Sequence, residues 1–112
     1  MALNLPLRAA AVAVLALIAA PAHADETGLA DIHVMRREGG RLCFLDHYHY
    51  GSSKGQSSER AAKLVAVQSW SGFVDLEYGS DWARYSRAHS PSIKCERDGT
   101  MWGCLVEARP CK

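Results

Sequence analysis

The longest regular hydrophobic pattern of the chain lies between residues 58 and 77. Apolar side chains recur there at spacings of three and four residues, which is typical of a helix that buries one face. Ser57 is a suitable N-cap residue, and Gly79 is a suitable stop just beyond the end. The pattern therefore predicts one long helix over residues 58–77, with a buried stripe formed by Ala62, Leu64, Val65, Trp70 and Phe73.

Two short strand-like runs precede this helix. The first covers residues 31–35, and the second covers residues 41–50, which are rich in aromatic and apolar side chains. The turn residues Gly39 and Gly40 lie between them, so the two runs predict a hairpin. Residues 51–58, with the sequence GSSKGQSS, have the composition of a loop and are expected to connect the second strand to the helix.

Alternating apolar and polar positions return after the long helix. A short helix is expected around Trp82, and beyond it Ile93 and Cys95 alternate with polar neighbours. The same alternation covers residues 102–109. Because the dipeptide Asp98-Gly99 between the two runs is a strong hairpin signal, the last part of the chain predicts two antiparallel strands.

These elements fit the α+β class, with a small antiparallel sheet and one long helix packed on one face. The buried stripe of the helix is expected to meet Phe44, Ile93, Trp102 and Val106 of the sheet. A core of this size is modest, and chains this small usually need covalent cross-links to be comfortably stable.

Residues 1–24 have the three parts of a secretory signal peptide. Arg8 supplies a positive charge, residues 9–20 are apolar, and Ala22-His23-Ala24 fits an A-x-A cleavage site. An apolar helix of this length rises about 18 Å, well short of the roughly 30 Å core of a bilayer. The sequence thus predicts a signal peptide at 1–24 and a single small secreted domain at 25–112, periplasmic or extracellular, with no transmembrane anchor after cleavage.

The net charge of the predicted secreted domain indicates which class of partner to expect. Of the 13 Lys+Arg residues only Arg8 lies in the leader, so the rest of the chain carries 12 Lys+Arg against 12 Asp+Glu. A chain without net charge lacks the basic excess that is typical of nucleic-acid-binding proteins. We therefore expect no nucleic-acid partner, and the location favours a periplasmic protein as the partner class.

The four cysteines, Cys43, Cys95, Cys104 and Cys111, all follow the leader. An even number in a short exported chain indicates disulfides, and the chain has no C-x-x-C spacing. Strand alternation places Cys95 and Cys104 on one face of adjacent strands, so we expect this pair to be bridged, which leaves Cys43 with Cys111. Two other pairings stay open: Cys43–Cys95 with Cys104–Cys111, and Cys43–Cys104 with Cys95–Cys111.

The most distinctive chemistry lies in the segment LDHYHYGSS at residues 45–53. On a regular strand His47 and His49 share one face, where two imidazoles can bind one metal ion. A zinc or copper site needs a third ligand, for which His33 is the natural candidate and His89 a remoter one. The alternative is a pair of polar histidines at a strand end, half exposed to solvent and without a metal.

A hydrolase is the weaker interpretation of the same segment. Its nucleophile would be a nearby serine, with His47 or His49 as the base and Asp46 as the orienting group. The chain has no G-x-S-x-G elbow, and serines at loop and cap positions need no catalytic explanation. We assign no catalytic residue and expect a non-enzymatic protein.

Most tryptophans and tyrosines of a chain this small are expected to lie in its core. Trp82 is the expected exception, because the polar residues Asp81, Arg84 and Arg87 surround it in the sequence. A partly exposed Trp82 is therefore the candidate surface for a protein partner.

Several motifs together resemble a group of small exported proteins of Gram-negative bacteria. They are DHYHYGSSKGQSS at 46–58, Trp70, EYGSDW at 77–82, Cys95, WGC at 102–104 and VEARPC at 106–111. The resemblance covers roughly residues 41–112 and implies export and a single domain. It implies no activity, cofactor or partner, and it transfers no role to any residue.

Two functions follow from these observations as hypotheses. The first is a disulfide-stabilised binding module of the cell envelope, which takes a divalent metal such as copper or zinc, or a small ligand, near His47 and His49. The second is a protein-interaction module, an inhibitor or accessory subunit, that uses the Trp82 surface.

Overall fold

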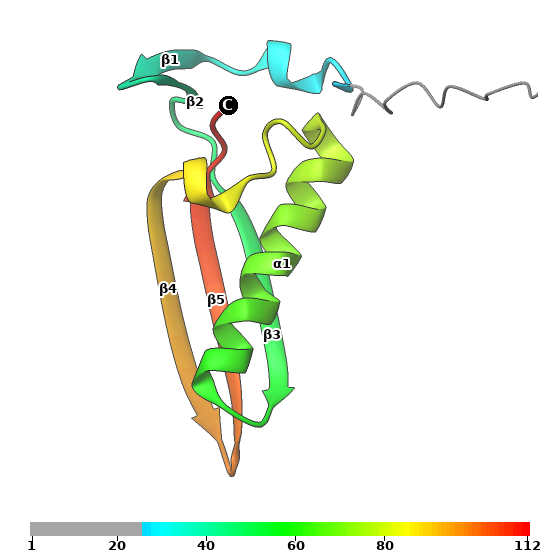
Figure 1. Ribbon diagram of the computed structural model, residues 1–112, viewed down its shortest axis with the longest axis vertical. Helices are drawn as coiled ribbons and strands as arrows, with labels where there is room; N and C mark the ends of the chain where they lie inside the picture. Colours follow the sequence, from blue (N-terminus) through cyan, green and yellow to red (C-terminus); the bar gives the residue numbers. More distant parts are fainter. Residues whose placement is uncertain (1–25) are drawn as a thin grey trace, which may run out of the picture.

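The computed structural model describes residues 26–112, so the predicted signal peptide lies outside the described residues. Its first half contains a 3-10 helix η1 (Leu29–Ile32) and strands β1 (Met35–Glu38), β2 (Arg41–Phe44) and β3 (His49–Gln56). The second half contains helix α1 (Glu59–Tyr78), a 3-10 helix η2 (Tyr85–Arg87) and strands β4 (His89–Asp98) and β5 (Met101–Arg109) (Figure 1). Among these residues no helix is both long and apolar enough to cross a bilayer.

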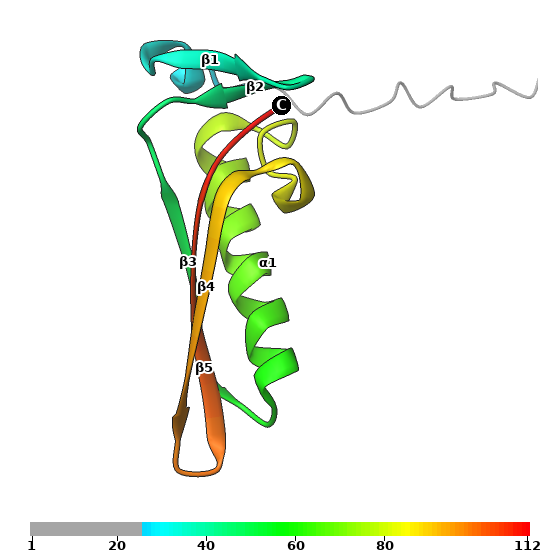
Figure 2. The same ribbon diagram turned by 90° about the vertical axis from the view of Figure 1, so that its left-hand side faces the viewer.

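The fold is α+β, as predicted, with its strands divided between two antiparallel sheets. β1 pairs with β2, and β3, β5 and β4 form a second sheet in that order. Helix α1 covers one face of the three-stranded sheet, and β1 and β2 lie across one end (Figure 2). No element of the described residues covers the other face. The sheet is thus buried on one side, which is common for antiparallel sheets.

Helix α1 begins and ends at the signals present in the sequence. The side chain of Ser58, not that of the predicted Ser57, accepts a hydrogen bond from the N–H of Ala61 over 3.0 Å. Gly79 ends the helix with a φ of 104°, a conformation that side chains other than glycine rarely adopt. The helix therefore spans nearly the predicted range.

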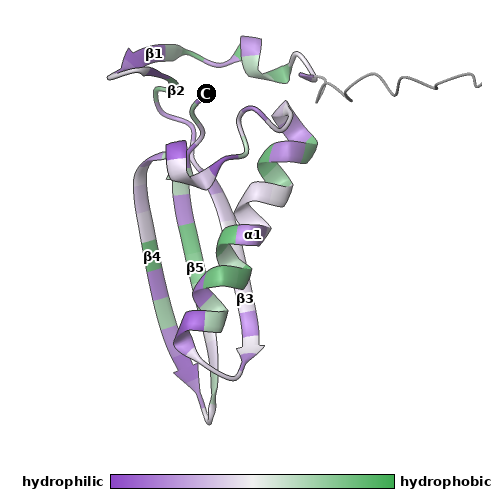
Figure 3. Ribbon diagram, in the orientation of Figure 1, coloured by the Kyte–Doolittle hydropathy of each residue, from purple (hydrophilic) through white to green (hydrophobic). Residues whose placement is uncertain are grey.

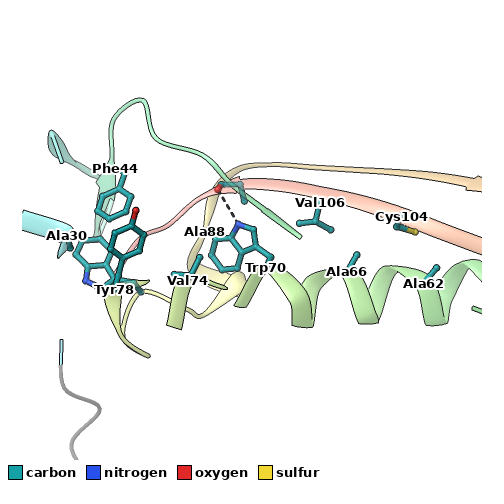
Figure 4. Packing of buried hydrophobic residues seen from close by; sticks show 12 residues of the cluster. Ala30, Phe44, Ala62, Ala66, Trp70, Val74, Tyr78, Ala88, Cys104 and Val106 are labelled. Carbon is teal, nitrogen blue, oxygen red and sulfur yellow. Dashed lines mark hydrogen bonds between the residues drawn. The ribbon is translucent and has the colours of Figure 1, made fainter. Parts of the chain in front are cut away.

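The core lies between α1 and the three-stranded sheet and continues past the end of the sheet, where Ala30, Phe44 and Tyr78 gather (Figure 4). The indole Nε1 of Trp70 donates to the carbonyl oxygen of Ala108 on β5 over 3.2 Å, which satisfies this buried donor. The buried residues of α1 recur every four positions: Ala62, Ala66, Trp70, Val74 and Tyr78.

Two members of the predicted stripe, Leu64 and Phe73, are 60% and 58% exposed, so their assignment to the core is wrong. Each residue turns an α-helix by about 100°, which places Leu64 on the side opposite Ala62 and Ala66. Small residues at 62 and 66 let the helix backbone come close to the sheet. The apolar residues of the sequence alone did not show which side of the helix would face the sheet.

Residues 49–56 form strand β3, where the sequence predicted mostly loop. Gly51 lets this strand approach α1, because a Cβ there would lie 2.2 Å from the carbonyl oxygen of Ala66. The buried hydroxyl of Ser53 donates to the carbonyl of Ala62 over 2.6 Å and accepts from the N–H of Cys104 over 3.0 Å. Glycine and serine, which are common in loops, thus allow a close contact between β3 and α1. Packing against the helix overrides their preference for loop structure.

Replacing Gly51 with alanine should lower the free energy of unfolding by about 3 kcal/mol or more. The added Cβ would meet backbone atoms of α1, including the amide nitrogen of Trp70 at 2.4 Å, and these atoms cannot rotate away. Urea denaturation measures the change. Gly72→Ala is the control, because a Cβ at Gly72 meets no atom within 4 Å, and it should be neutral or stabilising. Similar losses in both variants would contradict the close approach.

The predicted position of the first strand is wrong, whereas both predicted hairpins are present. The first strand lies at Met35–Glu38 rather than at 31–35, because η1 occupies residues 29–32. The predicted hairpins around Gly39-Gly40 and Asp98-Gly99 are both present, with Glu38 opposite Arg41 and Asp98 opposite Met101. Ile93, expected in the core, is 37% exposed because α1 lies over β3 and β5 more than over β4.

Two disulfides tie these elements together, with the pairing that the sequence favoured. Cys95 and Cys104 are direct partners on β4 and β5, with their Cα atoms 4.1 Å apart. Cys43 of β2 is bonded to Cys111, where the chain after β5 runs beside β2. Backbone hydrogen bonds between Leu42 and Lys112, of 2.8 and 2.9 Å, flank this second bridge.

Candidate metal site

Three histidines from separate segments meet around Tyr78, at the C-terminal end of α1. Figure 1 shows η1 close to this end of the helix. His33 directly follows η1, His47 lies between β2 and β3, and His49 is the first residue of β3. The last turn of α1 adds Glu77 and Tyr78 to the group. We call these five residues, His33, His47, His49, Glu77 and Tyr78, the histidine cluster.

Aromatic packing positions the histidine cluster. The ring of Phe44, at the end of β2, lies 4.8 Å between centroids from His33 and 4.8 Å from Tyr78. His33 stacks on His47 with centroids 4.3 Å apart. Because Phe44 neighbours the bridged Cys43, the disulfide also fixes the support beneath the imidazoles.

The polar atoms of the cluster converge on Nε2 of His49. This atom lies 3.1 Å from Nε2 of His47, 3.2 Å from Oε2 of Glu77 and 3.0 Å from the hydroxyl oxygen of Tyr78. The Tyr78 hydroxyl also lies 3.1 Å from Nε2 of His33. His47, His49 and Glu77 therefore each offer one ligand atom within 4.8 Å of the other two.

These contacts outnumber the bonds that His49 can make. A neutral imidazole nitrogen carries either one hydrogen or one lone pair, so Nε2 of His49 can satisfy one of its three polar neighbours. A cation between His47, His49 and Glu77 would use two nitrogen lone pairs and one carboxylate oxygen at once. Tyr78 would then be free to donate to Nε2 of His33.

The spacing of the ligand atoms suits a transition-metal ion. Zinc lies about 2.0–2.1 Å from histidine nitrogen and about 2.0–2.2 Å from carboxylate oxygen. With bonds of that length, separations of 3.1 and 3.2 Å correspond to angles of about 100° at the metal. These two angles lie between the square and tetrahedral values.

The protonation states favour ligation as well. Burial lowers the pKa of His47 and of His49, neighbouring imidazoles lower both further, and the opposing effect of Glu77 is smaller than that of burial. Both rings are therefore neutral at physiological pH, the form in which histidine binds metals. Burial raises the pKa of Tyr78, so its hydroxyl stays protonated and can donate.

The cluster is accessible from solvent. A shallow hollow of about 320 Å³ opens beside it, lined by Ile32, His33, Val34, Asp46 and His47. The side chain of Glu77 is itself 43% exposed, and that of His49 is 12% exposed. An ion can thus reach the ligands without any opening of the fold.

The structure brings together only part of the site that the sequence predicted. His47 and His49 are adjacent, but the third ligand atom comes from Glu77, while His33 points at Tyr78. His89 lies elsewhere, with Nδ1 2.9 Å from a guanidinium nitrogen of Arg109. Glu77 was missed because it is 28 residues from His49 in the sequence, and its place in the last turn of the predicted helix was the only available signal.

Trp82 is buried, so the expectation that it is partly exposed is wrong. Its side chain is 1% exposed and stacks on Phe44 with centroids 4.7 Å apart. The ammonium group of Lys112 lies 5.1 Å from the centre of the indole ring and covers it. Of its polar neighbours in the sequence, Asp81 and Arg84 are exposed.

A buried ion pair joins Glu38 of β1 to Arg109 of β5, between the two sheets. A guanidinium nitrogen of Arg109 lies 2.9 Å from Oε1 of Glu38, and another donates to the carbonyl of Phe44 over 2.6 Å. Arg109 is only 4% exposed. Glu38 also lies near the sulfurs of Cys43 and Cys111, but these are bonded to each other and offer no thiolate to a metal.

Comparisons with protein-family models, with curated proteins and with solved structures found no match.

Proposed function

We propose that this protein is a disulfide-stabilised module that binds a divalent metal ion between His47, His49 and Glu77. The observation that carries the proposal is the convergence of three polar atoms on Nε2 of His49. A cation resolves this convergence, because the ligand atoms of His47, His49 and Glu77 then share one positive centre, and the Tyr78 hydroxyl is left to donate to His33. The resemblance to small exported proteins is compatible with this role and contributes no evidence for it.

The ligand set indicates which metals the site would prefer. Two imidazole nitrogens and one carboxylate oxygen suit zinc, copper(II) and nickel better than calcium or magnesium, which prefer oxygen ligands alone. Affinity at such sites rises toward copper(II) and falls again at zinc. The proposal is therefore a copper(II)- or zinc-binding protein, with copper(II) bound more tightly.

The two disulfides suggest that the protein matures in an oxidising compartment. Removal of residues 1–24 by a signal peptidase would deliver it there, and we place it in the periplasm or outside the cell. In that location a metal site on a cross-linked scaffold would bind or deliver an ion without catalysing a reaction.

Isothermal titration of the metal-free, oxidised protein tests the proposal. We expect binding of one copper(II) or zinc ion per chain, which is abolished by replacing both His47 and His49 with alanine. Glu77→Gln, which removes the charge but keeps the shape, should weaken binding by about tenfold or more, because loss of even an outer-shell partner of a ligand has an effect of that size.

Two control variants show whether the loss is specific. Asp75→Asn removes an exposed carboxylate from the same turn of α1, and His89→Ala removes an imidazole outside the histidine cluster. Both should bind metal like the unaltered protein. Absence of binding at micromolar metal, or equal losses in the controls, would contradict the proposed site.

A further inference from the structure

Strand β4 leaves a long free edge on the three-stranded sheet. Figure 1 shows no element beside its outer side, and within residues 26–112 its one partner is β5. All of its side chains are exposed except those of His89 and Cys95, which are half-buried. A free, extended edge presents unpaired backbone N–H and C=O groups, which can pair with another strand.

The Cys95–Cys104 pair shows which backbone groups of β4 point outward. The 4.1 Å between their Cα atoms is typical of a pair that exchanges no backbone hydrogen bonds. In agreement, the N–H of Cys104 bonds to the hydroxyl of Ser53 on β3 and so points away from β4. The N–H and C=O of Cys95 therefore face the free edge, and so do those of Ile93 and Arg97 by alternation.

The regular part of the edge is symmetric about Cys95. The pairing of β4 with β5 shifts between His89 and Ser92, where Ser90 has a φ of 51° and Pro91 lacks an N–H. From Ser92 to Asp98 the register is continuous. Cys95 is the middle residue of this stretch, so a second copy that runs antiparallel about Cys95 would pair with the whole of it.

The charges on this stretch are complementary to themselves in that register. Lys94 and Glu96 flank Cys95 and are exposed, and by strand alternation they point to the face opposite that of Cys95. Figure 3 shows hydrophilic and hydrophobic bands alternating along β4. In an antiparallel pair centred on Cys95, Lys94 of each copy stands opposite Glu96 of the other. These are the closer, non-hydrogen-bonded type of pair, in which opposite charges interact best.

From these observations we propose that two copies of this protein associate through the free edges of β4, antiparallel and with Cys95 opposite Cys95. The two three-stranded sheets then become one continuous sheet with the two α1 helices on the same face. The interaction uses outward backbone groups of Ile93, Cys95 and Arg97 and two Lys94–Glu96 pairs. It involves no residue of the histidine cluster and does not depend on the proposed metal.

Neighbouring registers are disfavoured by the same charges. Shifting the centre to Lys94 places two lysines opposite each other, and shifting it to Glu96 does the same with two glutamates. Centring on Arg97 sets Glu96 against Asp98 of the other copy. Like charges directly opposite each other destabilise a strand pair, so the register centred on Cys95 is selected.

Sedimentation equilibrium of the oxidised protein in a chelating buffer tests the proposal, since the chelator prevents metal-bridged contacts. We expect a monomer–dimer equilibrium. Lys94→Glu puts glutamate opposite Glu96 in both pairs and should raise the dissociation constant by about tenfold or more. The charge swap Lys94→Glu with Glu96→Lys restores both pairs and should return the constant to within about threefold of the original.

The matched control is Lys54→Glu, which makes the same change of charge at an exposed position of β3 and should leave the equilibrium unchanged. Hydrogen exchange gives a second readout, because the amides of Ile93, Cys95 and Arg97 should become protected as protein concentration rises. A protein that stays monomeric up to about 1 mM, where even weak complexes form, would overturn the proposal. A dimer that Lys94→Glu leaves intact, or that the charge swap fails to restore, would overturn it as well.

Discussion

Replacing Cys43 and Cys111 together with alanine should lower the free energy of unfolding by about 4 kcal/mol. This bridge joins residues 68 apart in the sequence, and in the chain-entropy model a long closed loop restricts the unfolded state most. Both cysteines are fully buried, so the loss of their packing adds to the effect. Urea denaturation of the oxidised variant, followed by circular dichroism, measures the change.

The second bridge supplies the comparison. Cys95 and Cys104 are 9 residues apart, and the same model assigns their bridge about 3 kcal/mol. The variant without Cys43–Cys111 should therefore be the less stable of the two. It should also bind metal more weakly, because that bridge fixes β2 and Phe44 beneath the histidine cluster. A larger loss of stability in the Cys95/Cys104 variant would show that local packing, and not loop length, governs the stabilisation.

Replacing Glu38 with glutamine should cost about 3–5 kcal/mol of stability near neutral pH, because it leaves the buried guanidinium of Arg109 without its counter-charge. Glu59→Gln is the control. It removes one partner of an exposed pair with Lys63, whose atoms are 3.4 Å apart, and should cost less than about 1 kcal/mol. Denaturant unfolding of both variants at pH 7 gives the two values.

The same ion pair predicts how stability depends on pH. The hydrogen bond from Arg109 lowers the pKa of Glu38 from 4.5 to about 2, even though burial acts in the opposite direction. A carboxyl group whose pKa is lowered by folding stabilises the fold fully above pH 4.5, and this contribution is lost as the pH falls toward 2. The stability gap between the unaltered protein and Glu38→Gln should narrow over that range. A gap that stays constant from pH 7 to pH 2 would contradict the assignment.

The sequence was informative wherever one local rule decides the structure. The alternation around Asp98-Gly99 located the last hairpin and set Cys95 opposite Cys104. Gly79 marked the end of the helix because few other residues adopt its conformation. With four cysteines, the first bridge also determined the second.

Where contacts between residues far apart in the sequence determine the structure, the prediction from local sequence was wrong. Gly51 and Ser53 belong to a strand because they fit against Ala62 and Ala66 of α1, a fit that no local preference of GSSKGQ reveals. The candidate site likewise has a part that local sequence predicted and a part that only the fold brings together. The spacing of His47 and His49 was visible in the sequence, whereas Glu77 joins them only because α1 ends beside the start of β3.

The order of strands has a consequence for biogenesis. β5 is the last strand along the chain, yet it lies between β3 and β4. Neither neighbour has a partner in this sheet until residues 101–109 have been synthesised, and pairing of β3 with β5 joins residues such as His49 and Ala108 that are far apart in sequence. Such non-local pairing is slow, so a growing polypeptide cannot complete this sheet until its last strand has been synthesised.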